Sequence, residues 1–223
     1  MDFVDTFLNW SVIVRTWPLL LAGIGNTLLL SATTIIGGGI GGVAVCLVRL
    51  YAPRPLNWLA IAFVDLFRAI PILVLLILVY YALPFMGIRL DSFTSAALAL
   101  GLVFSAFTAE VVRAGILAIP AGQLEAAKSI GLPFWVTMRR VILPQALRVA
   151  LPPHTSNCVA IAKDTSLASV VAMPDLLKQA TDAQALVANP SPLIAAALLY
   201  LCFLLPAVRL VALLEEKFKQ EQR

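Results

Sequence analysis

The chain consists largely of long runs of uncharged residues. No charged residue occurs between Arg15 and Arg49, and these 33 positions, at about 1.5 Å each, exceed the ~30 Å hydrocarbon core of a bilayer. Four further apolar segments follow, and each is long enough to cross the same core as a helix. We therefore predict five membrane-spanning segments, which lie within residues 19–47, 56–83, 93–116, 153–173 and 193–214.

Composition supports a membrane protein. Of the 223 residues, 61% are hydrophobic and only 13% are charged, and the mean hydropathy is +0.96. Soluble domains carry about 25% charged residues. The formal net charge of +4 is spread along the chain instead of forming a basic patch, which excludes a nucleic-acid-binding protein. The predicted fold class is an all-α polytopic membrane protein with about five transmembrane helices.

The distribution of Lys and Arg predicts the orientation. If the N-terminus lies outside, the inner segments hold 11 of the 16 basic residues and the outer segments hold three. This asymmetry follows the positive-inside rule, and it places the C-terminus in the cytoplasm. The predicted organisation is an outer interfacial segment (1–18), with Trp10 and Trp17 as aromatic anchors, then a transmembrane domain (19–214) and a cytoplasmic tail (215–223).

The longest inner segment, residues 117–151, is too polar to be a membrane span and too ordered to be a linker. Pro120 suits a first helical turn, strong helix formers follow, and Gly131 can adopt the left-handed conformation that ends a helix. Pro133 then begins a second short helix, which Pro144 is expected to stop. The pattern predicts a helix-turn-helix on the cytoplasmic face, and such a loop indicates a docking partner.

This loop carries a motif with defined spacing. It resembles the E-A-A-x3-G-x9-I-x-L-P signature of permease subunits of bacterial ABC importers, with Val141 in the place of isoleucine. The matching residues are Glu125, Ala126, Ala127, Gly131, Val141, Leu143 and Pro144. Four other segments, 67–73, 109–116, 143–148 and 163–168, are similar to the polar amino acid permease family. The likeness covers residues 20–214.

The resemblance implies a non-catalytic permease that dimerises with a second copy or a paralogue in the bacterial inner membrane. It implies two cytoplasmic ABC ATPase subunits, which bind ATP and Mg²⁺, and an extracytoplasmic substrate-binding protein. No cofactor or metal is expected in this chain. The seven motif residues would form a coupling helix that inserts into a groove of the ATPase. The expected substrates are polar amino acids or related small zwitterions.

Ionisable residues occur inside three of the predicted spans. A charge at the bilayer centre costs roughly 2.5–3.5 kcal/mol, so each needs a partner or a wet cavity. The pairs are Asp65 with Arg68, Glu110 with Arg113, and Lys163 with Asp164. Each pair could be internally neutral, or the charges could together receive the carboxylate and ammonium of an amino acid. With the resemblance, the candidate pore or substrate contacts are Arg68, Glu110, Lys163, Asp164 and Thr165. Ser166 and Ser169 are expected to hydrogen-bond within their helix.

Glycines in the first span offer a close helix contact. Gly37 and Gly41, and likewise Gly38 and Gly42, are spaced four apart, which lets a neighbouring helix approach. The G-x-G-x-x-G match within this run lacks the strand and helix that a dinucleotide site requires.

Two other function classes are compatible with a membrane protein of this kind. Intramembrane charges would suit a secondary transporter or channel driven by an ion gradient, but no inverted repeat with paired broken helices is visible. A membrane enzyme would need a nucleophile with its base, and no such constellation is present. The coupling loop favours the ATP-driven importer.

Overall fold

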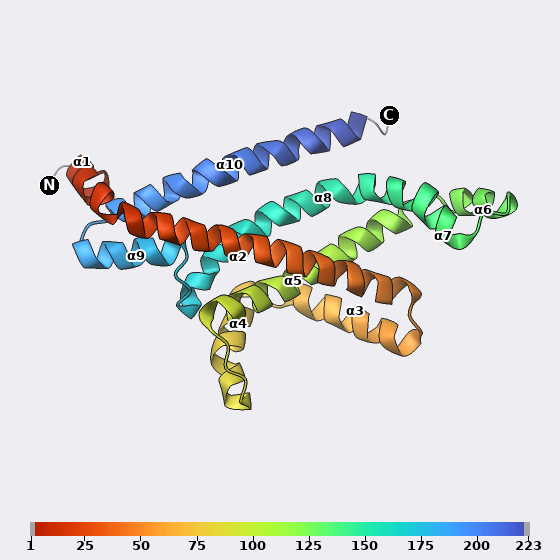
Figure 1. Ribbon diagram of the computed structural model, residues 1–223, viewed down its shortest axis with the longest axis horizontal. Coiled ribbons are helices and arrows are strands. Elements are labelled where there is room, and N and C mark those ends of the chain that lie inside the picture. The colour runs from red at the N-terminus through yellow and green to blue at the C-terminus, as the bar shows by residue number, and fades with distance from the viewer. Residues whose placement is uncertain (1–2, 221–223) are drawn as a thin grey trace.

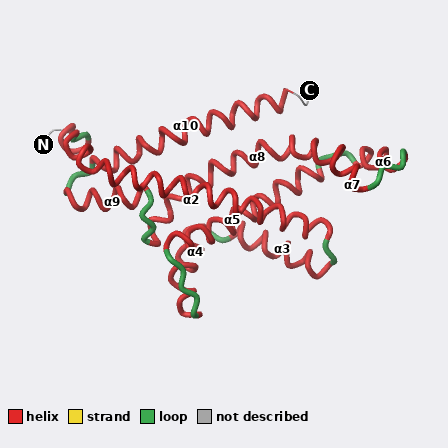
Figure 2. The backbone as a smooth tube through the Cα atoms, in the orientation of Figure 1, coloured by secondary structure: helices red, strands yellow, loops and turns green. Residues whose placement is uncertain are grey.

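The computed structural model describes residues 3–220, with the side chains of residues 5–217. This described part is helical throughout and contains no strand (Figure 2). Its elements are α1 (Phe3–Phe7), α2 (Trp10–Tyr51), α3 (Arg54–Ala69), α4 (Ile72–Ile77), the π-helix η1 (Leu78–Ala82), the 3-10 helix η2 (Leu83–Met86), α5 (Ser92–Leu117), α6 (Ala121–Ser129), α7 (Phe134–Thr137), the π-helix η3 (Met138–Ile142), α8 (Leu143–Asp164), the 3-10 helix η4 (Thr165–Val171), α9 (Leu176–Val187) and α10 (Ser191–Gln220).

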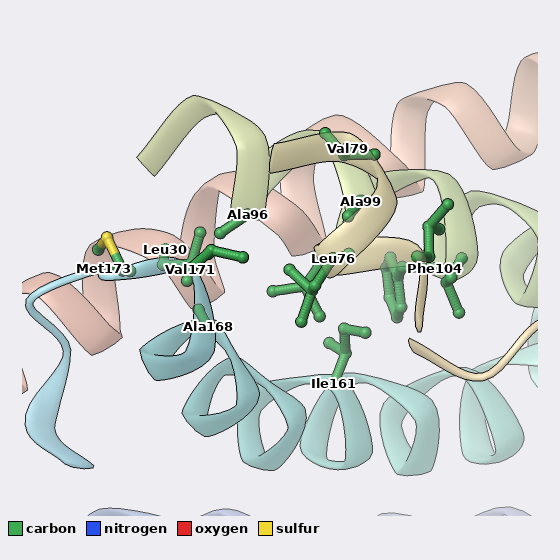
Figure 3. Close-up of a cluster of buried hydrophobic side chains, with 13 residues drawn as sticks. Leu30, Leu76, Val79, Ala96, Ala99, Phe104, Ile161, Ala168, Val171 and Met173 are labelled. Atoms are coloured by element: carbon green, nitrogen blue, oxygen red, sulfur yellow. The ribbon is translucent and has the colours of Figure 1, made fainter. Parts of the chain in front are cut away.

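The long helices α2, α5, α8 and α10 run roughly along the long axis of the molecule (Figure 1). Helices α1 and α9 lie at one end, and α6 and α7 lie at the other. A cluster of buried apolar side chains from α2, α4, α5, α8 and η4 joins the bundle (Figure 3). Leu76 and Phe104 are the largest contributors to its centre, and Ile161 approaches them from α8.

The contact between α2 and α5 depends on two glycines of α2. A Cβ atom on Gly42 would lie 2.5 Å from the Cβ of Thr108, and one on Gly38 would lie 2.8 Å from the backbone oxygen of Gly101. The predicted close packing at the pair Gly38 and Gly42 is therefore confirmed. In the other predicted pair only Gly41 lies at a close contact, since a Cβ there would lie 3.0 Å from Ser105 Oγ, whereas a Cβ on Gly37 would meet nothing within 4 Å.

The second predicted span, 56–83, is not one continuous helix. Helix α3 ends at Ala69, α4 begins at Ile72, and the two segments are bent by 105°. Pro71 disfavours the helical conformation of the residue before it, and Ile70 accordingly has an extended conformation (φ −74°, ψ 131°). The chain therefore turns in the middle of this apolar segment.

The other spans correspond to helices with different boundaries. In the described part, helices at Asp5–Tyr51, Ser92–Leu117 and Ser191–Lys217 are long and apolar enough to cross a membrane, and the bent pair gives a fourth segment. The predicted span 153–173 corresponds to the end of α8 and to η4.

The expected role of Pro144 is wrong. Pro144 lies in the first turn of α8, where the π-helix η3 runs directly into this helix and the amide of Leu143 donates to the carbonyl of Met138. It therefore begins the long helix instead of stopping a short one.

The two ends of the chain belong to long helices as well. The Asn9 side chain accepts a hydrogen bond from the amide of Val12 and caps α2, so Trp10 and Trp17 lie on the same helix as the first predicted span. Helix α10 continues through Glu215 to Gln220, so most of the predicted tail is helical. Residues 1–2 and 221–223 lie outside the described residues.

Candidate functional site

The first half of the motif loop folds as the sequence predicts. Helix α6 carries Glu125, Ala126 and Ala127, and only the last of these is buried. Gly131 has a positive φ of 74°. The amide of Leu132 donates to the carbonyl of Ala127 at 3.0 Å, and this bond completes a helix end that requires the left-handed glycine.

The second half of the loop leads directly into the long helix α8. Pro133 caps α7, as predicted, and the π-helix η3 follows with Val141. Leu143 and Pro144 then form the exposed first turn of α8. The motif residues therefore belong to two structures, the compact helix α6 with its glycine turn and the junction between η3 and α8.

Large apolar side chains of this loop are exposed. Ile130 is 75% exposed and Trp135 is 79% exposed, at the end of the molecule formed by α6 and α7 (Figure 1). Exposed apolar surface of this kind typically marks a contact with another protein or a membrane.

The motif loop also contacts the ends of the long helices. The ring of Phe134 meets the ring of Tyr51, the last residue of α2, edge to face with centroids 6.0 Å apart. Near the end of α5, a Cβ on Gly115 would lie 2.8 Å from the backbone oxygen of Ala146 in α8. The loop is thus anchored on the ends of α2, α5 and α8.

The charged pair in α5 has a third member. Glu110 forms ion pairs with Arg113, as its spacing predicts, and with Arg49 of α2. The Nε of Arg113 donates to Glu110 Oε2 at 3.2 Å, and Arg49 donates to the same oxygen. Arg49 is 61 residues away in sequence, so no local pattern indicates this partner. Both carboxylate oxygens of Glu110 are engaged by arginines.

The other predicted pairs behave differently. In the described part of the chain, Asp65 and Arg68 form no ion pair, so the alternative of an internally neutral pair does not hold for these two residues. The Arg68 guanidinium instead lies 5.5 Å from the centre of the Phe107 ring, within the range of a cation–π interaction. Asp65 is exposed.

The third pair lies where α8 changes into the 3-10 helix η4. Lys163 is exposed, Asp164 is half-buried, and the buried hydroxyl of Thr165 donates to the carbonyl of Ala162 at 2.8 Å. Ser166 donates to the carbonyl of Lys163, as expected. Helix η4 packs against α4, which begins just after Arg68. The segments that follow the two helix interruptions therefore meet here, whereas Arg68 itself lies on α3, beside Phe107 of α5.

A buried carboxylate at the other end of the molecule has no counterpart in the sequence prediction. Asp175 caps α9 by accepting from the amide of Lys178 at 2.9 Å, and it is fully buried. Burial raises the pKa of Asp175 to about 6. Thr27 of α2 accepts a hydrogen bond from the amide of Leu176 at 3.0 Å, so this cap is joined to the first long helix.

No group of three or more His, Cys, Asp or Glu side chains in the described residues is placed to hold a metal ion.

The chain is similar over most of its length to known transport proteins. The family model of the binding-protein-dependent transport system inner membrane component matches residues 34–220. The probable amino-acid ABC transporter permease protein YckA of Bacillus subtilis (strain 168) is 37% identical over 172 residues, which are 77% of this chain and 76% of that protein. The L-cystine transport system permease protein TcyB of the same organism is 37% identical over 180 residues, 80% of this chain and 77% of that protein. A crystal structure of an amino acid ABC transporter with histidines matches with a TM-score of 0.86 and 31% identity, over 97% of this chain and 99% of that one.

Proposed function

Because the chain belongs to the family of binding-protein-dependent transport system inner membrane components, we propose that it is the permease subunit of an ATP-driven importer for polar amino acids or related small zwitterions. It is a multi-pass protein of the inner membrane. Its own residues form the translocation pathway, and a separate ABC ATPase binds ATP and Mg²⁺ and hydrolyses the nucleotide.

The observation that carries the proposal is the exposed motif loop. The left-handed Gly131 holds α6 in a compact projection, and Ile130 and Trp135 present apolar surface beside it. The contact of Phe134 with Tyr51 joins this projection to a long helix, so a movement of the docked ATPase can reach the membrane segments. An ion-driven transporter has no need of such a loop.

The orientation and the assembly belong to the same proposal. The excess of basic residues in the predicted inner segments favours an external N-terminus and a cytoplasmic loop and C-terminus. On the opposite face, a substrate-binding protein delivers the amino acid. Two permease subunits, identical or paralogous, enclose the pathway and bind two ATPase subunits.

The charges at the interrupted helices are the proposed substrate contacts. Arg68 and Lys163 suit the carboxylate of an amino acid, and Asp164 suits its ammonium group. Half-helix ends within a membrane are typical of substrate sites in transporters. Thr165 and Glu110 are weaker candidates, because the hydroxyl of Thr165 and both oxygens of Glu110 are already engaged within the chain.

Co-purification tests the docking loop. The tagged chain is isolated in mild detergent from its native membrane, together with the variant Gly131→Pro. Proline cannot adopt a φ of 74°, so the variant should stay in the membrane but lose the ATPase. Gly122→Pro is the matched control, because Gly122 is the second residue of α6, where proline is tolerated. Normal recovery of the ATPase with Gly131→Pro would contradict the assignment.

Uptake tests the substrate site. Arg68→Ala and Lys163→Ala should assemble with the ATPase and lose most amino acid transport. Arg89→Ala, at an exposed loop position, should transport as the wild type does. Wild-type uptake by both test variants would remove the proposed site.

A further inference from the structure

We propose that the ion pairs among Arg49, Glu110 and Arg113 fasten the end of α2 to α5, so that α2 moves together with the motif loop. The inference rests on the proposed function, because it concerns how the loop transmits the movement of the ATPase. It assigns Arg49 and Glu110 a positioning role, distinct from any contact with substrate.

Connectivity explains why α2 needs such a fastening. Helix α5 leads into the loop through residues 118–120, and α8 leaves it directly at Leu143, so the backbone itself ties these two helices to the loop. Helix α2 ends at Tyr51 and continues into α3, away from the loop. Only side chains join the end of α2 to the loop and to α5.

Apolar side chains at the end of α2, among them Cys46 and Leu50, pack in one cluster with Ala109 and Val112 of α5, and two further side-chain contacts add to this packing. The first is the ring contact of Tyr51 with Phe134, and both of these side chains are exposed. A single aromatic pair of this kind contributes little beyond the area that it buries. The second contact, the ion pair of Arg49 with Glu110, lies one half-turn before the end of α2 and about two turns before the end of α5.

The ionic contact is the stronger of the two. The side chains of Arg49, Glu110 and Arg113 are 17%, 23% and 25% exposed, so water screens them only in part. One carboxylate receives hydrogen bonds from two guanidinium groups, and charged hydrogen bonds are about twice as strong as neutral ones. The close approach at Gly42, about two turns earlier in α2, keeps the two backbones in register below this contact.

The two arginines of the cluster have different roles: Arg49 joins α2 to α5, whereas Arg113 pairs with Glu110 within α5. Arg49 is the only member on α2, whereas Glu110 and Arg113 both belong to α5. Arg49→Ala therefore removes the ionic link from α2 to α5 and leaves the pair within α5 and the apolar packing of the two helices. Arg113→Ala removes a charge from the same cluster and leaves the link, which makes it the matched control.

Distance measurements on the assembled complex test this role. Spin labels are introduced through a non-canonical amino acid at the exposed positions Leu47 of α2 and Gln123 of α6, and the permease is isolated with its ATPase. The distance between the labels is measured with and without a non-hydrolysable ATP analogue. In the wild type, in Arg113→Ala and in the conservative variant Arg49→Lys, the nucleotide should leave this distance unchanged. In Arg49→Ala it should shift the distance.

Each other result overturns the inference. A nucleotide-dependent shift in the wild type would show that α2 does not move with the loop. An unchanged distance in Arg49→Ala would show that the ion pair is not needed, and an equal shift in Arg113→Ala would show that the link itself is not what matters. Failure of the ATPase to co-purify with the wild-type chain would be seen before nucleotide is added, and it would contradict the proposed function instead.

Discussion

Gly42 and Gly37 allow a sharp test of how α2 and α5 pack. Both lie in the interior of α2, so replacement by alanine gives each the same gain in helix propensity, about 1 kcal/mol. Their surroundings differ. A Cβ on Gly42 would lie 2.5 Å from the Cβ of Thr108 and 2.6 Å from the backbone oxygen of Ser105, whereas a Cβ on Gly37 would meet nothing within 4 Å.

The expected magnitude follows from this contrast. Neither a Cβ atom nor a backbone oxygen can rotate away, so Gly42→Ala forces the two helices apart. Overpacking of this kind costs typically about 1–3 kcal/mol, and the separation also weakens the apolar cluster around Phe104. Gly37→Ala should be neutral or stabilising by up to about 1 kcal/mol. Because the gain in helix propensity is common to both variants, their free energies of unfolding should differ by the overpacking cost, about 1–3 kcal/mol.

Reversible unfolding by SDS in mixed micelles, followed by circular dichroism, measures this difference. The wild-type chain and both variants are compared under the same conditions. Equal stability of Gly42→Ala and Gly37→Ala would refute the close contact between α2 and α5, and with it the register of these two helices.

Three further changes have defined outcomes. Burial raises the pKa of Asp175 from 3.8 to about 6, so the stability contributed by its protonated form is complete below pH 4 and is lost as the pH rises through 6. Asp175→Asn keeps a capping side chain and should have the same free energy of unfolding as the wild type near pH 4. At pH 8 the variant should be more stable than the wild type by about 3 kcal/mol. Gly131→Ala should raise amide exchange in α6 about fivefold, since a left-handed alanine costs about 1 kcal/mol, whereas Gly122→Ala should not. Ser156→Ala removes the 3.0 Å hydrogen bond to Glu215 of α10 and should lower the free energy of unfolding by about 1.5–3 kcal/mol. A double-mutant cycle with Glu215→Gln should assign that loss to the interaction of the two side chains.

Local signals in the sequence predicted the local structures well. The helix formers before Gly131, and the proline after it, specify a helix, a left-handed turn and a second helix start, and each of these depends only on neighbouring residues. The spacing of Gly38 and Gly42 likewise predicts a close helix contact, although it does not say which helix approaches. The pair Gly37 and Gly41 has the same spacing, and Gly37 nevertheless faces open space.

The errors concern prolines and distant partners. Pro71 breaks a predicted span, whereas Pro144, expected to end a helix, occupies the first turn of a long one. A proline is compatible with either role, and the packing of the following segment decides between them. The partnership of Arg49 with Glu110 could not be found, because opposite charges in two distant segments carry no information about which helix faces meet.

Candidate substrate residues were the hardest to predict. Charges within a predicted span are readily identified, but their roles depend on contacts that only the fold supplies. The fold commits Glu110 to two arginines and Thr165 to its own helix. It leaves Lys163 exposed at an interrupted helix.

The central proposal is that this permease works with an ATPase. The most direct measurement is uptake of a radiolabelled mixture of polar amino acids into proteoliposomes that hold the complex purified from the native membrane. ATP is enclosed inside, the substrate-binding protein is added outside, and ionophores collapse all ion gradients. We expect uptake that requires enclosed ATP and persists in the presence of ionophores. Uptake that an ion gradient drives without ATP would contradict the account and restore the secondary transporter.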